Sequence, residues 1–310
     1  MKKTKEYSFI SSTSGRLDSV SSLELNIPRS IFSDDSTLIL LNGKKAKKSS
    51  KIKENDRVEI RYVEETFEGL KKEDIPLDII YEDDDILVIN KEQGMVVHPG
   101  SGVNEGTLCN ALLNLYGEDF STSDDSVRPG IVHRLDKDTS GVMVIAKNRE
   151  AHLALTKEFS EHTNEKYYCA IAKGFFSESS GYIERRIVRD KNNRKKFTVT
   201  DNKSEGKDAL TKYRVISQNS EYAFLILRLY TGRTHQIRVH LSSINHPVLG
   251  DPIYSRVDKK YKDATLMLHS LRLVIHHPRS GEKIVFRAPL PERFNEILES
   301  EGLKKDDLVI

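Results

Sequence analysis

The spacing of apolar residues predicts four helices after residue 100. In these segments apolar side chains recur every three or four positions, as they do on the buried face of an amphipathic helix. The first helix begins near Glu105 and ends at Gly117. The second follows Asn148, a residue type that favours the N-cap of a helix. The other two cover residues 234–244 and 291–299.

Short runs rich in β-branched and aromatic residues predict strands around these helices. They cover residues 79–81, 86–90, 142–146, 166–173, 181–187, 197–200, 208–217, 222–230, 266–276 and 283–287. Many of these strands follow one another directly, whereas parallel neighbours would need a long crossover connection between them. The pattern therefore predicts the α+β class, with a mixed, largely antiparallel sheet and helices packed on it.

The first 62 residues have a pattern of their own and predict a small α/β domain. Asn42-Gly43 follows an apolar run, and this dipeptide strongly favours a two-residue hairpin turn. Residues 63–76 are an acidic linker that ends at Pro76. Residues 77–300 form the main domain and residues 301–310 a C-terminal tail. A chain of 310 residues is long enough for one large domain and one small one.

Charge is distributed unevenly, although the net charge of the whole chain is only +2. Residues 1–62 carry 13 Lys or Arg and 8 Asp or Glu, a net of +5. Residues 185–214 carry 11 Lys or Arg and 4 Asp or Glu, a net of +7. Residues 64–85 carry 2 Lys or Arg and 10 Asp or Glu, a net of −8. Two basic surfaces separated by an acidic segment are typical of a protein that binds phosphates at chosen places, although solvated surfaces would have the same composition.

The cysteines and the N-terminal residues exclude several classes of protein. Cys109 and Cys169 stand alone, without a Cys-x-x-Cys pair, so the sequence predicts neither a disulfide framework nor a zinc site. A reducing cytoplasm is the simplest location for such a chain. Residues 1–15 lack the apolar core of a signal peptide, and no apolar run approaches the length of a membrane span.

The strongest candidate for chemistry is the polar turn from His133 to Gly141, which lies between two short apolar runs. Loops at the rim of a sheet often carry functional residues, and this one holds Arg134, Asp136 and Asp138. The residues alone leave two plainer interpretations open. The turn is also compatible with a solvated loop that has weak local ion pairs. Asp136 and Asp138 are also compatible with the carboxylate pair of a glycoside hydrolase.

A specific resemblance favours another interpretation. The run His133-Arg-Leu-Asp-x-x-Thr-Ser-Gly141 resembles the catalytic signature of the RluA-type pseudouridine synthases, a family of RNA-modifying enzymes. Further segments resemble the family in the same order along the chain: Val97–Gly100, Lys166–Ala170, Gly232–His240, Gly250–Tyr254 and Leu268-His269. The resemblance covers about residues 77–295 and implies the pseudouridine synthase fold for the main domain.

The resemblance implies that uridine in RNA is converted to pseudouridine without a cofactor. Asp136 matches the catalytic carboxylate, which acts on the sugar as nucleophile or base and must be ionised for either role. Arg238 is its expected partner, with Arg233 as the alternative, because an arginine can hold a carboxylate through two parallel donors. Arg134 matches the residue that enters the stack vacated by the flipped base, and Tyr168 matches the residue that stacks on that base.

The residues expected to contact the RNA are His133, Arg233, His235, Gln236, Arg194, Lys44 and Lys45. His133 is expected to order the catalytic loop rather than to transfer protons. His235 and His240 are five positions apart, unlike the i, i+4 pairs that bind zinc on a helix, so no metal site is expected.

The first domain resembles an S4-type RNA-binding domain in its Arg16-Leu-Asp18 opening and its Asn-Gly hairpin. Lys44 and Lys45 lie beside that hairpin and are expected to contact phosphates. Such a domain would give the enzyme a second contact with its RNA.

Three segments of the main domain look most like the RluD-like branch of the family, which acts on 23S ribosomal RNA: Pro76–Asp83, Val96–Gly100 and Gly250–Tyr254. The RluC type, which also acts on large-subunit RNA, is an alternative. A catalytically idle RNA-binding or ribosome-assembly factor is an alternative from another class. The expected partner is ribosomal RNA or an assembling large subunit, and the protein is expected to be a cytoplasmic monomer without membrane contact.

Overall fold

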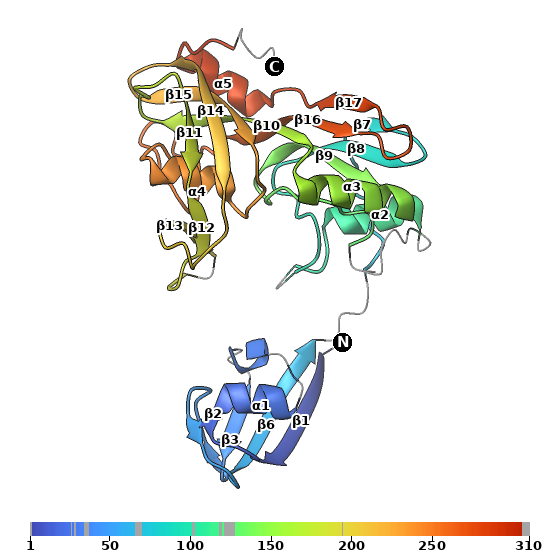
Figure 1. The fold of residues 1–310 in the computed structure, drawn as a ribbon, viewed down its shortest axis with the longest axis vertical. Helices are drawn as coiled ribbons and strands as arrows, with labels where there is room; N and C mark the ends of the chain where they lie inside the picture. The colour runs from blue at the N-terminus through green and yellow to red at the C-terminus, as the bar shows by residue number, and fades with distance from the viewer. Residues whose placement is uncertain are drawn as a thin grey trace. The chain divides into compact units, whose positions relative to one another are not determined.

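The computed structural model divides the chain into two compact units, Met1–Gly69 and Leu70–Ile310, which are drawn in Figure 1. The residues described are 2–25, 27, 29–33, 37–65, 70–100, 103–117, 120, 128–193 and 195–305. No helix among these residues is long and apolar enough to span a membrane.

The first unit is a four-stranded antiparallel sheet with one helix. Its elements are β1 (Lys2–Ile10), β2 (Gly15–Arg16), α1 (Leu17–Glu24), η1 (Arg29–Ser33), β3 (Leu38–Leu41), β4 (Lys44–Lys45), β5 (Lys51–Ile52) and β6 (Arg57–Glu65). The sheet has the order β1-β6-β3-β4, and β2 pairs with β5. Asn42 and Gly43 connect β3 to β4 with φ of 51° and 76°, so the predicted two-residue hairpin is confirmed.

Strand β6 crosses the domain boundary predicted at residue 62. It pairs with β1 along its whole length, so that Glu65 lies opposite Lys2. Because β1 supplies backbone partners that far, the strand continues past Tyr62 into acidic residues predicted as linker. The first unit therefore extends beyond the boundary that charge and composition suggested.

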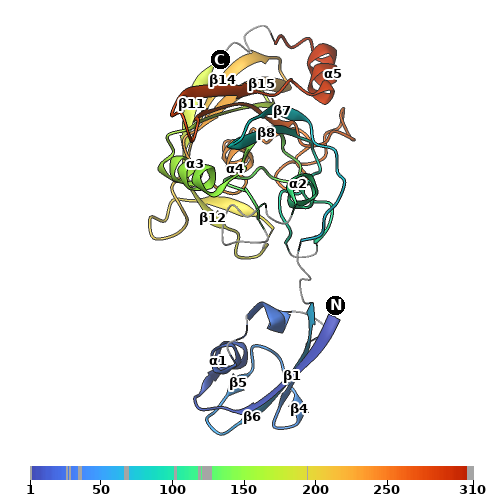
Figure 2. The same cartoon turned by 90° about the vertical axis from the view of Figure 1, so that its right-hand side faces the viewer.

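The second unit contains a large sheet with helices on both sides. Its elements are β7 (Ile79–Glu82), β8 (Ile86–Lys91), α2 (Leu108–Tyr116), β9 (Ser140–Ala146), α3 (Arg149–Glu161), β10 (Glu165–Lys173), β11 (Ser180–Glu184), β12 (Arg186–Arg189), β13 (Phe197–Thr200), β14 (Leu210–Gln218), β15 (Tyr222–Leu229), α4 (Gln236–Ser243), β16 (Leu268–His276), β17 (Lys283–Arg287) and α5 (Glu292–Ser300). Helices α3 and α4 lie on one side of the sheet and α5 on the other (Figures 1 and 2).

The main sheet has the order β11-β14-β15-β10-β16-β9-β8-β7, with β17 paired to β16. Among its described pairs only β9 and β16 are parallel, through Ser140 and Gly141 opposite His269 and Ser270. The other pairs are antiparallel, so the α+β class with a largely antiparallel sheet is confirmed. The parallel junction lies at the centre of the sheet and joins its two halves.

Local sequence signals predicted the helices well. The four predicted helices correspond to α2, α3, α4 and α5, and Gly117 follows the last residue of α2. Asn148 caps α3, because its Oδ1 accepts the backbone N–H of Ala151 at 2.9 Å. The single strand predicted at 181–187 is wrong. The segment forms two strands, β11 and β12. Strand β11 pairs with β14 in the main sheet, whereas β12 pairs with β13 in a separate two-stranded sheet.

Gly141 permits the close approach of β9 and β16. Its φ is 113°, and a Cβ there would lie 2.2 Å from the backbone O of Ser270. We expect Gly141→Ala to cost more than the roughly 1–3 kcal/mol of a strained conformation, because β16 must also move. Gly281, with φ of 72° and nothing within 4 Å of its Cβ position, is the matched control, since Gly281→Ala adds strain alone. Equal losses in urea unfolding of the two variants would contradict the steric argument.

Candidate active site

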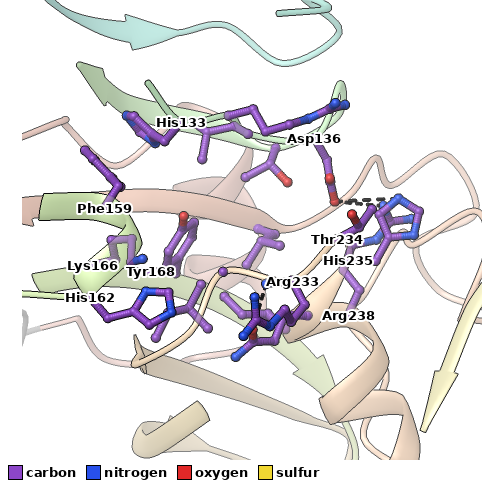
Figure 3. Close-up of a pocket in the computed structure, with 18 of the residues that line it drawn as sticks. His133, Asp136, Phe159, His162, Lys166, Tyr168, Arg233, Thr234, His235 and Arg238 are labelled. Carbon is purple, nitrogen blue, oxygen red and sulfur yellow. Dashed lines mark hydrogen bonds and ion pairs between the residues drawn. The ribbon is translucent and has the colours of Figure 1, made fainter. Parts of the chain in front are cut away.

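A cavity of about 610 Å³ lies in the second unit, and Figure 3 shows the side chains that line it. The lining includes residues 132–136 and 139 of the loop before β9, the end of α3, the start of β10 and residues 232–238 at the start of α4. Asp136 is the only carboxylate among the described residues in the lining, whereas Arg134, Lys166, Arg233 and Arg238 are cations. This excess of positive charge favours an anionic ligand.

Arg238 connects Asp136 to a second, buried carboxylate. Its Nη1 donates to Asp136 Oδ2 at 3.2 Å, while its Nε and Nη2 donate to the two oxygens of Asp251 at 2.7 and 2.9 Å. The side chains of Arg238 and Asp251 are 4% and 0% exposed, and that of Asp136 is 21% exposed. Burial alone would lower the pKa of Arg238, but the hydrogen bond to Asp251 and the charges of both carboxylates raise it above its ordinary value. Arg238 is therefore a permanent cation beside a carboxylate that still reaches the cavity.

The two-donor contact predicted for Asp136 is made to Asp251 instead. Oδ1 of Asp251 also accepts the backbone N–H groups of Ile253 and Tyr254, so this buried charge is fully hydrogen-bonded. Asp136 receives one donor on Oδ2, and its Oδ1 has no hydrogen bond to any described residue. The arrangement fixes the carboxylate on one side and leaves its other oxygen available to a substrate.

His235 lies beside the same carboxylate. The backbone N–H of Phe197 donates to the hydroxyl of Tyr254 at 2.8 Å, so the hydroxyl proton is free to bond His235 Nδ1, also at 2.8 Å. Burial is the main cause of a lowered pKa at His235, so its ring is neutral at pH 7. The bond to Tyr254 is compatible with the tautomer that carries its proton on Nε2, and Nε2 lies 3.8 Å from Asp136 Oδ2. The backbone of His235 has φ of 56°, an uncommon conformation for a residue other than glycine.

His133 and Lys91 hold the loop that carries Asp136. The ring of His133 stacks on Phe159 with centroids 4.4 Å apart, and its Nε2 accepts the backbone N–H of Val144 at 3.0 Å. Burial lowers the pKa of His133 to about 3, which fits a role in ordering the loop. Lys91 is 1% exposed, and its Nζ donates to three backbone oxygens. One of these, at 3.1 Å, belongs to Lys137, which follows Asp136 in the chain.

Tyr168 on β10 faces the cavity and is 7% exposed. Burial is the main cause that raises the pKa of its hydroxyl, so the group stays protonated at neutral pH. Arg134 lines the same cavity from an exposed position, with Nη1 3.2 Å from His98 Nε2. Arg233, the alternative partner for Asp136, instead donates its Nε–H to the backbone O of Asp208 at 3.0 Å.

The prediction that Gln236 binds RNA needs correction. Its Nε2 donates to Leu210 O and Thr211 Oγ1 at 3.1 and 3.0 Å. Its Oε1 accepts from Thr231 Oγ1 and the backbone N–H of Arg233 at 2.8 and 2.9 Å. Four hydrogen bonds use the whole capacity of an amide side chain, so Gln236 holds the loop before α4 and has no group left for RNA.

Two further predicted RNA contacts belong to the first unit. Lys44 and Lys45 form β4 in the first unit, and both are exposed. Arg194 lies outside the described residues. Asp138 does not line the cavity, so the structure gives no support to the carboxylate pair of a glycoside hydrolase.

One group of side chains away from the cavity has the spacing of metal ligands. Asp83, Asp85 and His277 bring one ligand atom each within 4.8 Å of one another. Arg279 donates to both oxygens of Asp85 at 2.7 Å, and His277 contacts Asp83 at 2.9 Å. Asp83 Oδ1 also accepts the backbone N–H groups of Asp85 and Ile86 at 2.8 Å, so the group is explained as a hydrogen-bonded network that fixes the turn between β7 and β8.

Sequence analysis missed three residues of the site. Asp251 and Tyr254 were noticed only as parts of a segment, and their contacts with Arg238 and His235 depend on the folded chain. Lys166 had a usable signal, since it precedes Tyr168 by two positions on a strand and so faces the same way.

The chain is similar to known pseudouridine synthases. The family model described as RNA pseudouridylate synthase matches residues 85–243. Ribosomal large subunit pseudouridine synthase D of Borreliella burgdorferi is 44% identical over 272 residues, covering 86% of this chain and 82% of that protein. The enzyme of the same name from Escherichia coli is 39% identical over 274 residues, covering 84% and 82%. The solved structure of human RNA pseudouridylate synthase domain containing 4 has 26% identity and a TM-score of 0.59, covering 74% of this chain and 94% of that one.

Proposed function

Because the chain belongs to the RNA pseudouridylate synthase family, which isomerises uridine in RNA, we propose that it makes pseudouridine in large-subunit ribosomal RNA with Asp136 as its catalytic carboxylate. The observation that carries the proposal is Asp136, the one carboxylate that the described residues contribute to the cavity, held by Arg238 on one oxygen and open on the other. The names of the relatives from Borreliella burgdorferi and Escherichia coli support the ribosomal substrate.

The reaction requires one ionised carboxylate and no electron transfer. The bond from ribose C1′ to uracil N1 breaks, the base turns over, and C1′ is joined to C5. The proton of C5 is lost and N1 gains a proton, so atoms balance without a cofactor. Asp136 acts at the sugar, as nucleophile on C1′ or base on C2′, while Arg238 holds its Oδ2 by a hydrogen bond.

The target base must leave its stack before Asp136 can reach the sugar, at a cost of a few kcal/mol. Arg134 is exposed at the rim of the cavity, in a position to fill the vacated stack. Tyr168 lies inside, where its ring can stack on the flipped base. The same two residues would then both favour the flipped state.

The function is tested with transcripts that carry tritium at C5 of uridine, because forming pseudouridine releases that tritium. Stem-loops of large-subunit RNA are compared with small-subunit RNA and transfer RNA. Release from large-subunit RNA alone supports the proposal. Release from another RNA alone would mean that this other RNA is the substrate. Binding without release from any of them would favour an RNA-binding assembly factor.

We propose that the first unit is an S4-type domain that binds phosphates through Lys44 and Lys45, both exposed beside the hairpin. The variant Lys44→Ala/Lys45→Ala should weaken RNA binding and reduce the slope of log K against log salt by roughly 0.7–0.9 per lysine. The matched control is Lys304→Ala/Lys305→Ala, which removes the same charge from exposed positions in the second unit. The salt dependence of both double variants is measured by filter binding. An equal change in slope for the two would contradict a specific role of β4 in phosphate binding.

We also propose that the protein acts as a monomer in the cytoplasm. Cys109 and Cys169 are both buried thiols, which is compatible with a reducing compartment. Sedimentation with and without RNA tests the monomer.

A further inference from the structure

Lys166 is a buried cation that has no ion-pair partner among the described residues. Its side chain is 8% exposed and lines the cavity (Figure 3). None of the described residues forms an ion pair or hydrogen bond with its Nζ, whose ring contact is Phe159 at 5.7 Å from the centroid. A buried ammonium without a partner is costly, and here burial is the main cause that lowers the pKa of Lys166 to about 8.

Arg233 places a second cation beside the first. Its Nε is bonded to a backbone oxygen, but neither terminal nitrogen bonds any of the described residues. Its charge also contributes to the lowered pKa of Lys166. Like charges repel, and Asp136, the one carboxylate among the described lining residues, already binds Arg238. These two cations therefore lack a neutralising anion among the described residues.

Gly232 leaves the space that such an anion needs. A Cβ at this position would lie 3.8 Å from Lys166 Nζ and meet no other heavy atom within 4 Å. The backbone beside the two cations is therefore open to the cavity rather than covered by a side chain. A ligand group can approach both cations there without displacing protein.

We propose that Lys166, Arg233 and the open backbone at Gly232 form a binding subsite for one phosphodiester group of the substrate RNA, next to the target uridine. The inference rests on the proposed function, and phosphodiesters are the anionic groups that an RNA brings. Lys166 and Tyr168 are two residues apart on one strand face, about 6.6 Å, which is within the reach of a single nucleotide. The phosphate that binds here would be fixed relative to the base on Tyr168.

The test uses tritium release from a stem-loop RNA in which one phosphate beside the target uridine is replaced by a neutral methylphosphonate. One such replacement should lower kcat/KM of the wild type about 10- to 100-fold, as for a lost hydrogen bond between charged groups. Lys166→Met should lose a similar factor on ordinary RNA. The same replacement should then cost Lys166→Met less than about threefold, because the contact is already absent. The matched control, Lys304→Met, removes an exposed lysine outside the cavity and should keep the full sensitivity.

Two results would overturn the subsite. The first is a wild-type enzyme that tolerates a neutral linkage at every position flanking the target, a result that requires no variant to fold. The second is a full additional loss for Lys166→Met on each neutral RNA, which would assign Lys166 to packing against Phe159 or to a contact with the base. If the wild type releases no tritium from any ordinary RNA, the proposed function fails, and the two failures are thereby distinguished.

Discussion

Asp136→Asn should remove tritium release while leaving RNA binding close to that of the wild type. The amide keeps the shape of the side chain and can still accept from Arg238 Nη1, 3.2 Å away in the wild type, so we expect the loop to keep its conformation. It can neither attack C1′ nor take a proton from C2′, and such a group contributes about 10²–10⁴-fold to a rate. Because Asp136 is also the only carboxylate lining the described cavity, no neighbour there can replace it. Single-turnover assays with enzyme in excess would measure the loss.

Asp138→Asn is the matched control for that experiment. It makes the same change two residues further along the loop, at a side chain that does not line the cavity. We expect its single-turnover rate to stay within a few-fold of the wild type. Equal losses for the two variants would mean that loop charge, rather than the position of Asp136, controls the reaction.

Arg238→Met should unfold more easily and also lose activity, for two separate reasons. The side chain of Asp251 is 0% exposed, so removal of Arg238 leaves a buried carboxylate without its cation, which costs about 3–5 kcal/mol. Asp136, 21% exposed, loses its donor, and a donor that stabilises charge in an active site contributes about 10²–10³-fold. Urea unfolding and tritium release measure the two effects independently.

The double variant Arg238→Met/Asp251→Asn separates these effects. The amide that replaces the Asp251 carboxylate is neutral, and its oxygen can still accept the backbone N–H groups that Asp251 binds at 2.8 and 3.0 Å. We expect most of the stability to return, because the unpaired charge is gone, while the activity stays low. A double variant as unstable as Arg238→Met would assign the loss to packing, and recovered activity would exclude Arg238 as the partner of Asp136.

Structural features that depend on interactions within a few residues were predictable from the sequence. Asn148 caps α3 by a bond to a backbone group three residues away, and the hairpin at Asn42 and Gly43 depends on two φ angles. The end of β6 and the break between β11 and β12 were mispredicted, because both depend on which strand lies alongside. Strand pairing depends on tertiary structure, which the local sequence pattern does not determine.

The candidate site also has features that the sequence suggested and features that appear only in the folded chain. Asp136 and Arg238 are 102 residues apart, and only the family resemblance suggested their contact. The resemblance did not indicate that Asp251 takes two of the three hydrogen bonds of Arg238, nor that protein groups occupy the whole amide of Gln236. Lys166 has a recognisable place in the sequence, but its lack of an ion-pair partner among the described residues appears only once the neighbouring side chains are placed.

The parallel junction between β9 and β16 has a consequence for the order in which the protein folds. Ser140 ends the loop of Asp136, and its Oγ lies 2.8 Å from Nδ1 of His269, 129 residues later in the chain. Strand β16 is inserted between β9 and β10, so the strands that carry the loop and Tyr168 are not aligned until it arrives. Contacts so distant in sequence form slowly, because a long loop must close first. A growing chain that has passed residue 240 therefore already contains Asp136, Tyr168 and Arg238, yet it has no assembled site until synthesis has passed β16.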